Sequence, residues 1–321
     1  MPRVSNTNYQ VPPFLKNPHL NTLYAAIFRK VTDLHYQRQR VETPDGDFLD
    51  LDWSSIGADR LILVLHGLEG SANRPYVRGM IKYFNQHGWD GVGMNFRGCS
   101  GVLNRKIPTY HMGSTGDLAF VVEQIQALDR YREVVIAGFS LGGNVVLRYL
   151  GEQGQHLPKI VGKGVAFSVP CDIKSSNEEI NKWYNALYLD RFLKSMNKKM
   201  EAKAASFPAF NASPFGRRAR SFNEFDEWFT APMNGFKNAV DYWTKAASLP
   251  VLSQINVPTL LINAKDDTFL AENCYPYELA AENRHLYFEC PPHGGHVGFV
   301  EFKTKGAYYT DRRALEFISR S

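Results

Sequence analysis

The sequence predicts an α/β protein whose doubly wound, mostly parallel sheet carries an inserted helical cap. Short apolar runs, such as residues 61–65, alternate along the chain with helix-like segments, and strands buried on both faces of a parallel sheet have this composition. From Ser168 onward, by contrast, about ninety residues pass without such a run. We therefore expect a core formed by residues 1–170 and 251–321, with the cap at residues 171–250.

The predicted elements begin with a β-hairpin. Residues 36–43 and 48–54 lie on either side of a turn that contains Asp45 and Gly46, and Asp-Gly between alternating apolar residues is a strong hairpin signal. The residues before the hairpin show no regular pattern, and we expect an irregular segment there.

The buried strands and the core helices follow in alternation. Strands that alternate with helices imply right-handed crossovers and therefore a parallel order of the strands. We expect these strands at residues 61–65, 90–96, 134–137, 164–169, 259–262 and 286–289. We expect core helices at residues 76–86, 116–128, 145–150 and 312–318.

The expected cap consists of helices at residues 178–193, 222–229 and 236–247, which are rich in Trp and Phe. A helical insertion in such a sheet is expected to lie over the carboxyl ends of the strands, where ligands bind. We expect Trp228 and Phe236 to help line an apolar pocket there. The alternative is that these aromatic side chains only attach the cap to the sheet, because aromatics at helical spacing commonly belong to a core.

The charge of the chain is close to balance. Thirty-seven Lys and Arg residues against 32 Asp and Glu give a net charge of +5, and part of the excess lies in clusters at residues 194–203 and 217–220. Nucleic-acid-binding surfaces carry denser basic stripes with interleaved aromatic residues. We therefore expect solvated basic patches and no nucleic-acid partner.

The cysteines and the apolar runs bear on the location of the protein. Cys99, Cys171, Cys274 and Cys290 are far apart and form no CxxC pair, so reduced thiols are expected. The first residues contain no apolar run typical of a signal peptide, and no stretch of 18 apolar residues occurs. We expect a soluble, cytoplasmic protein without a transmembrane segment; peripheral membrane contact and the oligomeric state stay open.

The clearest chemical signal is the run Gly138-Phe-Ser140-Leu-Gly142-Gly143. It follows the strand expected at residues 134–137 and opens the next helix, which is the context of a nucleophile elbow. The serine of such a turn has a strained backbone, so its neighbours must be small where the two arms approach each other. The sequence therefore predicts Ser140 as a nucleophile at the amino end of a helix.

A serine nucleophile needs a base, and the base needs an acid that orients it. Asp266 and Asp267 follow the strand expected at residues 259–262, and His293 and His296 follow the last strand. This order of serine, acid and histidine is typical of one class of serine hydrolases. We predict His296 as the base; the H-x-x-H pattern that it forms with His293 lacks a carboxylate-rich helix, so we expect no metal site.

The choice between the two acids depends on spacing. Asp267 stands three residues after the small residue Ala264, whereas the same interval leads from Asp266 back to Asn263. In this class of hydrolases the acid commonly follows a small residue at that distance, so we predict Asp267. We expect Asp266 to bond to nearby backbone or to a local partner instead.

A negatively charged oxygen that forms during acyl transfer needs hydrogen-bond donors. These are normally the backbone N–H after the nucleophile, here that of Leu141, and one from the loop after an earlier strand. The loop His66-Gly67-Leu68-Glu69-Gly70 fits the second place, and we predict the N–H of Leu68 as its donor. His66 precedes the nucleophile in the chain, and we expect it to organise this loop.

Together these motifs resemble those of the α/β-hydrolase superfamily, and more closely those of its YheT-like branch, which includes eukaryotic lipid-active members. The resemblance covers nearly the whole chain. Besides the serine run, its motifs are Asn17-Pro-His19-Leu-Asn-Thr22, His66-Gly-Leu-Glu-Gly70, Asn95-Phe-Arg-Gly98, Thr109-Tyr-His111, the segment from Phe225 through Thr230-Ala231 to Gly235-Phe236, Asn263-Ala-Lys-Asp-Asp267 and His293-Gly-Gly-His296-Val-Gly-Phe299. The chain departs from the family at Asn21, where Gln is usual, and at Thr268, where Pro is usual.

The resemblance implies a serine hydrolase that cleaves carboxylic esters through Ser140, His296 and Asp267 without a cofactor. We expect an acyl-enzyme intermediate and substrates with short- to medium-chain acyl groups or lipid-like character. Two alternatives stay open, namely an acyltransferase that uses the same residues and a non-catalytic ligand-binding protein on a hydrolase scaffold.

Overall fold

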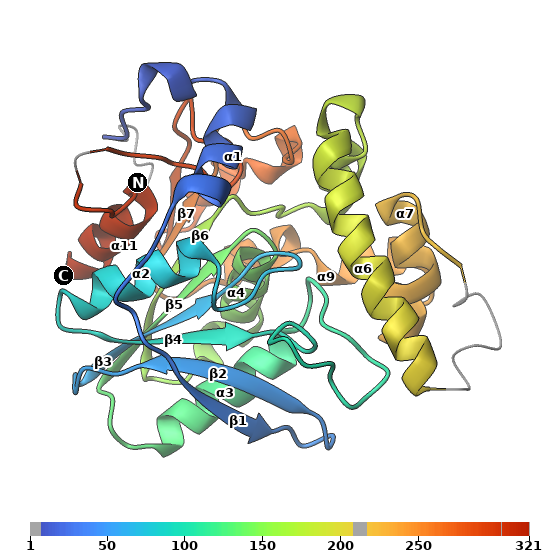
Figure 1. Ribbon diagram of the computed structural model, residues 1–321. Helices are drawn as coiled ribbons and strands as arrows, with labels where there is room; N and C mark the ends of the chain where they lie inside the picture. The colour runs from blue at the N-terminus through green and yellow to red at the C-terminus, as the bar shows by residue number, and fades with distance from the viewer. Residues whose placement is uncertain (1–7, 208–216, 303, 321) are drawn as a thin grey trace.

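The computed structural model describes residues 8–207, 217–302 and 304–320. An eight-stranded sheet forms its centre, in the order β1-β2-β4-β3-β5-β6-β7-β8 (Figure 1). The strands are β1 (Gln37–Glu42), β2 (Phe48–Ser54), β3 (Arg60–Leu65), β4 (Asp90–Asn95), β5 (Glu133–Phe139), β6 (Val161–Phe167), β7 (Thr259–Ile262) and β8 (Leu286–Glu289). All the predicted strands are present.

The sheet is parallel from β4 to β8 and antiparallel only at one edge. The hairpin of β1 and β2 pairs antiparallel, with Glu42 opposite Phe48, and β2 pairs antiparallel with β4. The remaining neighbours pair in parallel. This topology confirms the prediction of a mostly parallel, doubly wound sheet.

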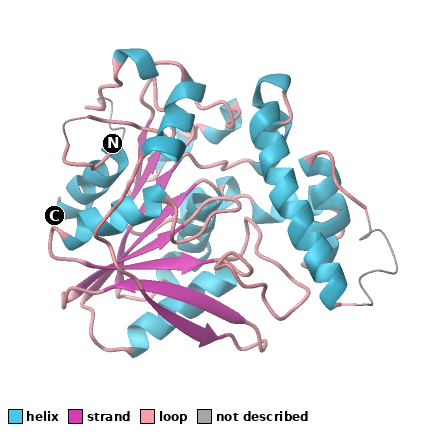
Figure 2. Ribbon diagram, viewed as in Figure 1, coloured by secondary structure: helices cyan, strands magenta, loops and turns pink. Residues whose placement is uncertain are grey.

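Helices cover both faces of the sheet, which explains why its central strands are continuous apolar runs (Figure 2). In β3, Leu63 and Leu65 face one core cluster, while Ile62 and Val64 face the other. The first cluster includes residues of α3 (Thr115–Ala127), α4 (Leu141–Gln153) and α10 (Tyr277–Glu282), and the second includes residues of α2 (Pro75–Asn85) and α11 (Tyr309–Ser319).

The segment between β6 and β7 is helical in its described part, and its elements lie to the right of the sheet in Figures 1 and 2. We call these helices, α5 to α9, the cap. They are α5 (Ile173–Ile180), α6 (Ala186–Ser206), α7 (Phe222–Phe225), α8 (Ala231–Met233) and α9 (Ala239–Ala246), with a π-helical turn at Asp226–Thr230.

The cap helices differ from the expected ranges. The helix expected at residues 178–193 is two helices, because α5 ends at Ile180 and a 3₁₀ turn precedes α6. The side chain of Asn185 donates hydrogen bonds to the carbonyls of Glu179 and Thr268, which fixes the chain at this break. The helix expected from residue 236 begins only at Ala239, where Asn238 caps it.

The expectation of an irregular N-terminal segment is wrong for α1 (Pro18–Phe28). The Asn17 side chain accepts hydrogen bonds from the N–H groups of His19 and Leu20, and Pro18 occupies the first helical position. Asn followed by Pro is a helix-start signal that the sequence contains. Its apolar periodicity is hard to recognise because several apolar side chains of α1 point outward.

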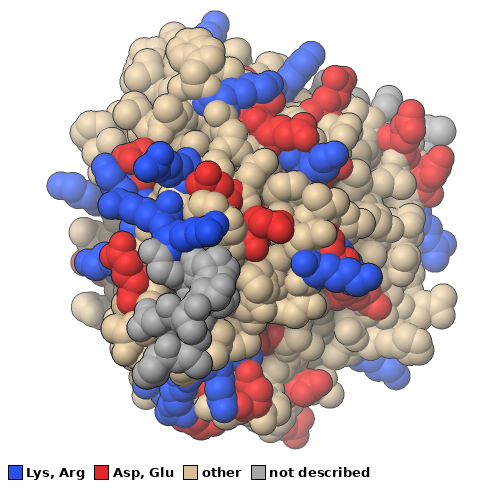
Figure 3. Space-filling model, turned by 90° about the vertical axis from the view of Figure 1, so that its right-hand side faces the viewer, with Lys and Arg blue, Asp and Glu red and all other residues tan. Residues whose placement is uncertain are grey.

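The surface of the cap side carries mixed charge. Figure 3 shows that Lys and Arg side chains are interspersed with Asp and Glu over this face. The described residues contain no helix that is long and apolar enough to cross a membrane. All four cysteines are free.

Candidate active site

Ser140 occupies a one-residue turn between β5 and α4. Its backbone has φ 53° and ψ −119°, a left-handed conformation that is strained for a residue with a side chain. Two backbone hydrogen bonds hold this turn, from the N–H of Ser140 to the carbonyl of Phe167 and from the N–H of Asn144 to the carbonyl of Ser140. The turn fixes Ser140 at the amino end of α4.

The glycines around Ser140 are required by close backbone approach. A Cβ atom on Gly138 would lie 2.4 Å from the carbonyl oxygen of Gly142, and a Cβ on Gly142 would lie 2.5 Å from that of His66. Neither carbonyl can move without displacing a core strand or helix. The motif therefore has the steric cause that the sequence predicts.

The structure brings Ser140, His296 and Asp267 together. His296 Nε2 lies 2.9 Å from Ser140 Oγ, and His296 Nδ1 lies 2.9 Å from Asp267 Oδ2. Asp267 is 4% exposed, and its Oδ1 also accepts a hydrogen bond from the N–H of Phe269. With Nδ1 donating to the carboxylate, Nε2 is free to accept the Ser140 hydroxyl proton.

The His296 loop is held by groups distant in sequence. The N–H of His296 donates to Thr22 Oγ1 of α1, and the N–H of Val297 donates to Ser168 Oγ. The ring of Phe269 stacks on the imidazole, with the ring centres 4.2 Å apart. The part played by Thr22 was not predicted, because α1 itself was not predicted.

Asp266 forms a separate pair beside this one. Its Oδ2 lies 3.1 Å from His293 Nδ1, and its Oδ1 accepts a hydrogen bond from the N–H of Gly295. Burial raises the pKa of Asp266, and the bonds from Gly295 and His293 oppose that shift. Asp266 thus bonds to the loop that carries His296 and not to nearby backbone as expected, while Asp267 is the acid that contacts His296.

The loop after β3 approaches the elbow closely. A Cβ on Gly67 would lie 3.2 Å from the Cβ of Ser140. The N–H of Gly67 donates to the hydroxyl of Tyr76, and the N–H of Glu69 donates to that of Tyr110. Within the described residues, the N–H of Leu68 between them has no hydrogen-bond partner.

Leu141 offers a second N–H of this kind. It begins α4 directly after Ser140, and the described residues give its N–H no partner. Free donors at a helix amino end favour negative charge. The N–H groups of Leu68 and Leu141 are therefore available to a negatively charged oxygen.

His66 organises the loop, as expected. Its Nε2 accepts a hydrogen bond from the N–H of Phe96, so Nδ1 carries the proton and donates to the carbonyl of Gly67. Complete burial lowers the pKa of His66 to about 4, which keeps the ring neutral.

Two cavities meet at Ser140 and His296, which line both. Cavity 1 lies between the core and the cap and is largely apolar. Its lining includes Leu68, Met196, Met200, Phe222 and Phe225. Cavity 2 lies between α1 and α6, and Tyr76 and Arg191 are among its lining residues.

The expected aromatic lining is corrected by the structure. Trp228 and Phe236 are absent from the lining of both cavities, whereas Phe222 and Phe225 line cavity 1. Phe236 instead packs in a cluster with Tyr242. Periodicity indicates that a cap helix has an apolar face, but it does not indicate which aromatic residues face the cavity.

The basic cluster at residues 194–203 is only partly solvated, contrary to expectation. Lys199 Nζ lies 2.8 Å from Glu69 Oε1, and Lys203, which is 2% exposed, donates to the carbonyls of Lys106 and Ile107. Burial lowers the pKa of Lys203 to about 8. Arg217, at the start of the second cluster, is exposed as expected.

Glu69 joins the loop after β3 to the cap. Its carboxylate accepts hydrogen bonds from Tyr110, from Lys199 and from Ser195. Burial opposes ionisation, but Lys199 and these hydrogen bonds hold the pKa of Glu69 below its usual value. Glu69 is adjacent to Leu68, so the cap contacts the core directly beside the free N–H.

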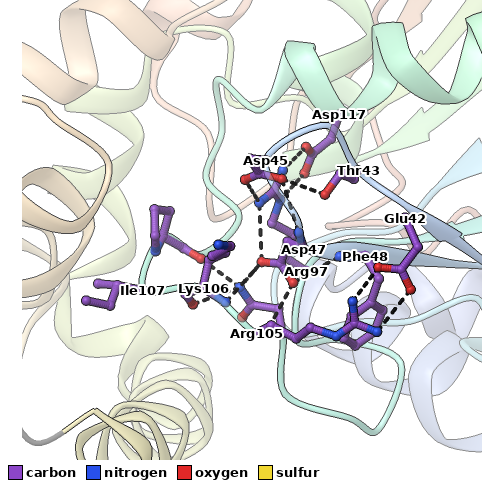
Figure 4. A network of polar contacts seen from close by, with 12 residues as sticks. Glu42, Thr43, Asp45, Asp47, Phe48, Arg97, Arg105, Lys106, Ile107 and Asp117 are labelled. Carbon is purple, nitrogen blue, oxygen red and sulfur yellow. Dashed lines mark hydrogen bonds and ion pairs between the residues drawn. The ribbon is translucent and has the colours of Figure 1, made fainter.

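The wall of cavity 1 opposite α6 is the loop after β4, which a polar network supports (Figure 4). Arg97 donates two hydrogen bonds to Asp117 and others to Asp45 and Asp47 of the hairpin. Asn104, which lines cavity 1, donates to Asp47 as well. The hairpin thus fixes one wall of the cavity.

The described residues contain no group of three or more His, Cys, Asp or Glu arranged to hold a metal ion. His293 is paired with Asp266 and His296 with Asp267.

Comparisons with known proteins show which family this chain is similar to. A family model described as the alpha/beta hydrolase fold matches residues 60–303. The protein named Putative esterase YheT of Escherichia coli is 34% identical over 291 residues, which cover 88% of this chain and 84% of that protein. Phospholipase ABHD3 of Homo sapiens is 29% identical over 308 residues, covering 92% of this chain and 75% of that protein.

Solved structures share the fold at lower identity. The esterase Pf2001 of Pyrococcus furiosus aligns with a TM-score of 0.61 and 19% identity, covering 99% of this chain and 96% of that one. The match to the family model spans most of the chain, and the YheT match spans more of it. The chain therefore belongs to the alpha/beta hydrolase fold family, within its YheT-like branch.

Proposed function

We propose that this chain, an α/β hydrolase that hydrolyses carboxylic esters, does so through Ser140, His296 and Asp267. Residues 171–250 would form its cap, between core segments 1–170 and 251–321. The observation that carries the proposal is the unbroken hydrogen-bonded series from Asp267 through His296 to Ser140 Oγ, with both contacts of His296 at 2.9 Å.

The proposed reaction proceeds through an acyl-enzyme. Ser140 Oγ attacks the ester carbonyl carbon while His296 Nε2 takes its proton, and the carbonyl oxygen becomes negatively charged. The N–H groups of Leu68 and Leu141 stabilise this oxygen. His296 then gives the proton to the departing alcohol, and a water molecule repeats the sequence to release the acid.

The substrate is proposed from the shapes and linings of the two cavities. Cavity 1, with its apolar lining, accepts the acyl chain, and the alcohol part lies toward cavity 2. The relatives include an esterase and a phospholipase by name. Short- to medium-chain acyl esters and lipid-like esters fit this division.

The proposal is tested with p-nitrophenyl esters of increasing chain length on the wild type and on Ser140→Ala. We expect Ser140→Ala to lower kcat by about 10⁴- to 10⁶-fold with the fold intact. A fluorophosphonate probe should label the wild type alone. Equal labelling of both proteins would falsify the assignment of Ser140.

A further inference from the structure

Exposed apolar side chains gather on the elements that form one side of cavity 2, namely α1 and the start of the cap. Thirteen large apolar side chains are exposed in the described residues. Seven of them lie in the N-terminal segment, at the start of the cap, or at Phe302, which packs on the N-terminal segment. We call these seven the outer apolar face: Phe14, Leu20, Ile27, Phe28, Trp183, Leu187 and Phe302. Single exposed apolar residues are ordinary, but a cluster of this size indicates a contact surface.

Ring contacts join three members of the outer apolar face, Phe14, Phe28 and Phe302. Phe302 stacks on Phe14 and meets Tyr24 edge to face, and Tyr24 packs on Phe28. These contacts bring residue 302 against the outer side of α1.

The cap adjoins the same surface. His19 of α1 stacks on Tyr188 of α6 and lies 3.2 Å from its hydroxyl, and Trp183 packs against Tyr184 at the start of that helix. Trp183 and Leu187 are 85% and 82% exposed. Figure 1 shows α1 and the start of α6 at the same end of the molecule.

The charge of this region favours an anionic partner. The first 32 residues contain no Asp or Glu. Lys16 and Lys30, on either side of α1, are exposed, and so is Arg191 of α6, while Asp190 on that helix is paired with Lys194. Exposed aromatic and aliphatic side chains flanked by cations are the composition of helices that lie in the interface of an anionic membrane.

The position of α1 links this surface to the candidate site. Thr22 and Leu23 of α1 line cavity 2 together with Tyr188 of α6, and Ser140 and His296 line the same cavity. A lipid surface in contact with α1 and the start of α6 would therefore lie beside the cavity that Ser140 lines.

We propose that the outer apolar face docks onto a lipid surface with anionic headgroups, so that ester substrates pass from the lipid into cavity 2. The docking stands on the surface alone. The delivery of substrate rests on the proposed function.

The binding test uses vesicles of phosphatidylcholine with and without phosphatidylglycerol, and measures co-sedimentation of the whole chain. We expect the wild type to bind the vesicles that contain phosphatidylglycerol, and added salt to weaken the binding. Ile27→Ser/Phe28→Ser should reduce binding at least about tenfold, since two large apolar groups no longer enter the lipid. The matched control is Ile56→Ser/Leu128→Ser, which changes two equally exposed apolar residues elsewhere and should bind as the wild type does.

Two further measurements separate docking from catalysis. Ser140→Ala should bind vesicles as the wild type does. Ile27→Ser/Phe28→Ser should hydrolyse dispersed p-nitrophenyl butyrate at the wild-type rate. Failure of the docking proposal can therefore be told apart from failure of the proposed catalytic function. Brominated lipid should quench the tryptophan fluorescence of the wild type but not that of Trp183→Phe, because Trp183 is the tryptophan placed to enter the lipid. Absence of vesicle binding, equal binding of the variant and the wild type, or a dimer that Ile27→Ser/Phe28→Ser dissociates would overturn the docking proposal.

Discussion

The core and the cap contribute to the candidate site in different ways. The core positions Ser140, Asp267 and His296 through its backbone, since each follows a strand of the sheet and is held by main-chain hydrogen bonds. The cap contributes side chains such as Lys199 on Glu69 and Phe222 in cavity 1. The hydrogen-bonded series of Asp267, His296 and Ser140 is therefore built from core residues.

A consequence is that changes in the two regions should differ in kind. A change in Ser140, His296 or Asp267 should remove a reacting group. A change at the contact between cap and core should displace an N–H group that binds the negatively charged oxygen. A change in the cavity lining should alter which substrates are preferred. These effects are ordered by size, and each can be measured separately.

After the loss of Ser140 itself, the largest effect is expected for Asp267→Asn in the core. The amide cannot hold His296 in the tautomer that accepts the Ser140 proton, which costs about 10⁴ in kcat in the serine-protease case. Asp266→Asn is the matched control, because Asp266 contacts His293 and Gly295 instead. We expect it to lose tenfold or less in kcat/KM, measured on one activated ester with circular dichroism to monitor folding.

A reversed order of damage would contradict this assignment. It would mean that the acid is Asp266 and that His293 or a rearranged loop supplies the base. Equal damage in both variants would indicate that the loop depends on the two carboxylates together.

An intermediate effect is expected where the cap meets the core. In Lys199→Met the Glu69 carboxylate loses its cation and one of the two hydrogen bonds that join it to α6, and the bond from Ser195 stays. We expect kcat to fall by about tenfold to a hundredfold with little change in KM, because the N–H of Leu68 is displaced but not removed, and removal of one such donor costs about 10²- to 10³-fold. The affinity for a trifluoromethyl ketone should fall by the same factor.

The control for this change is Lys194→Met on the same helix, where the side chain is 65% exposed and pairs with Asp190. It should leave kcat unchanged, because exposed ion pairs contribute little. Lys199→Arg should recover part of the loss. If Lys199→Met raised KM and left kcat unchanged, the contact would serve substrate binding rather than the geometry of the loop.

The same contrast between core and cap governs what the sequence predicts. The core strands were predicted because burial on both faces requires apolar residues at every position, as in residues 61–65. The elbow was predicted because its glycines have a local steric cause. Asp267 was predicted over Asp266 from a spacing that is common in this family, and the two Asn variants test that choice.

The cap resisted prediction because its geometry depends on distant partners. Lys199 belongs to a basic cluster that looks solvated, yet its partner Glu69 lies 130 residues away in the chain. The break before α6 depends on bonds from Asn185 to carbonyls that include Thr268. Sequence periodicity does not report contacts of this kind.

The smallest effect is expected in the cavity lining, where a cap aromatic that lines cavity 1 can be compared with one that does not. Phe222 lines cavity 1, whereas Trp228, a half-buried aromatic residue of the same segment, does not. Phe222→Ala should lengthen the cavity and raise the preference for longer over shorter acyl chains by about threefold to tenfold, since pocket contacts of one or a few methylene groups give modest selectivity. Trp228→Ala should leave the chain-length profile unchanged even if it lowers the melting temperature. The measurement is kcat/KM across the p-nitrophenyl ester series with thermal unfolding of each variant.

A change of chain-length preference in Trp228→Ala alone would place the acyl chain outside cavity 1. An equal loss of kcat/KM at all chain lengths in Phe222→Ala would mean that Phe222 only stabilises the packing of the cap.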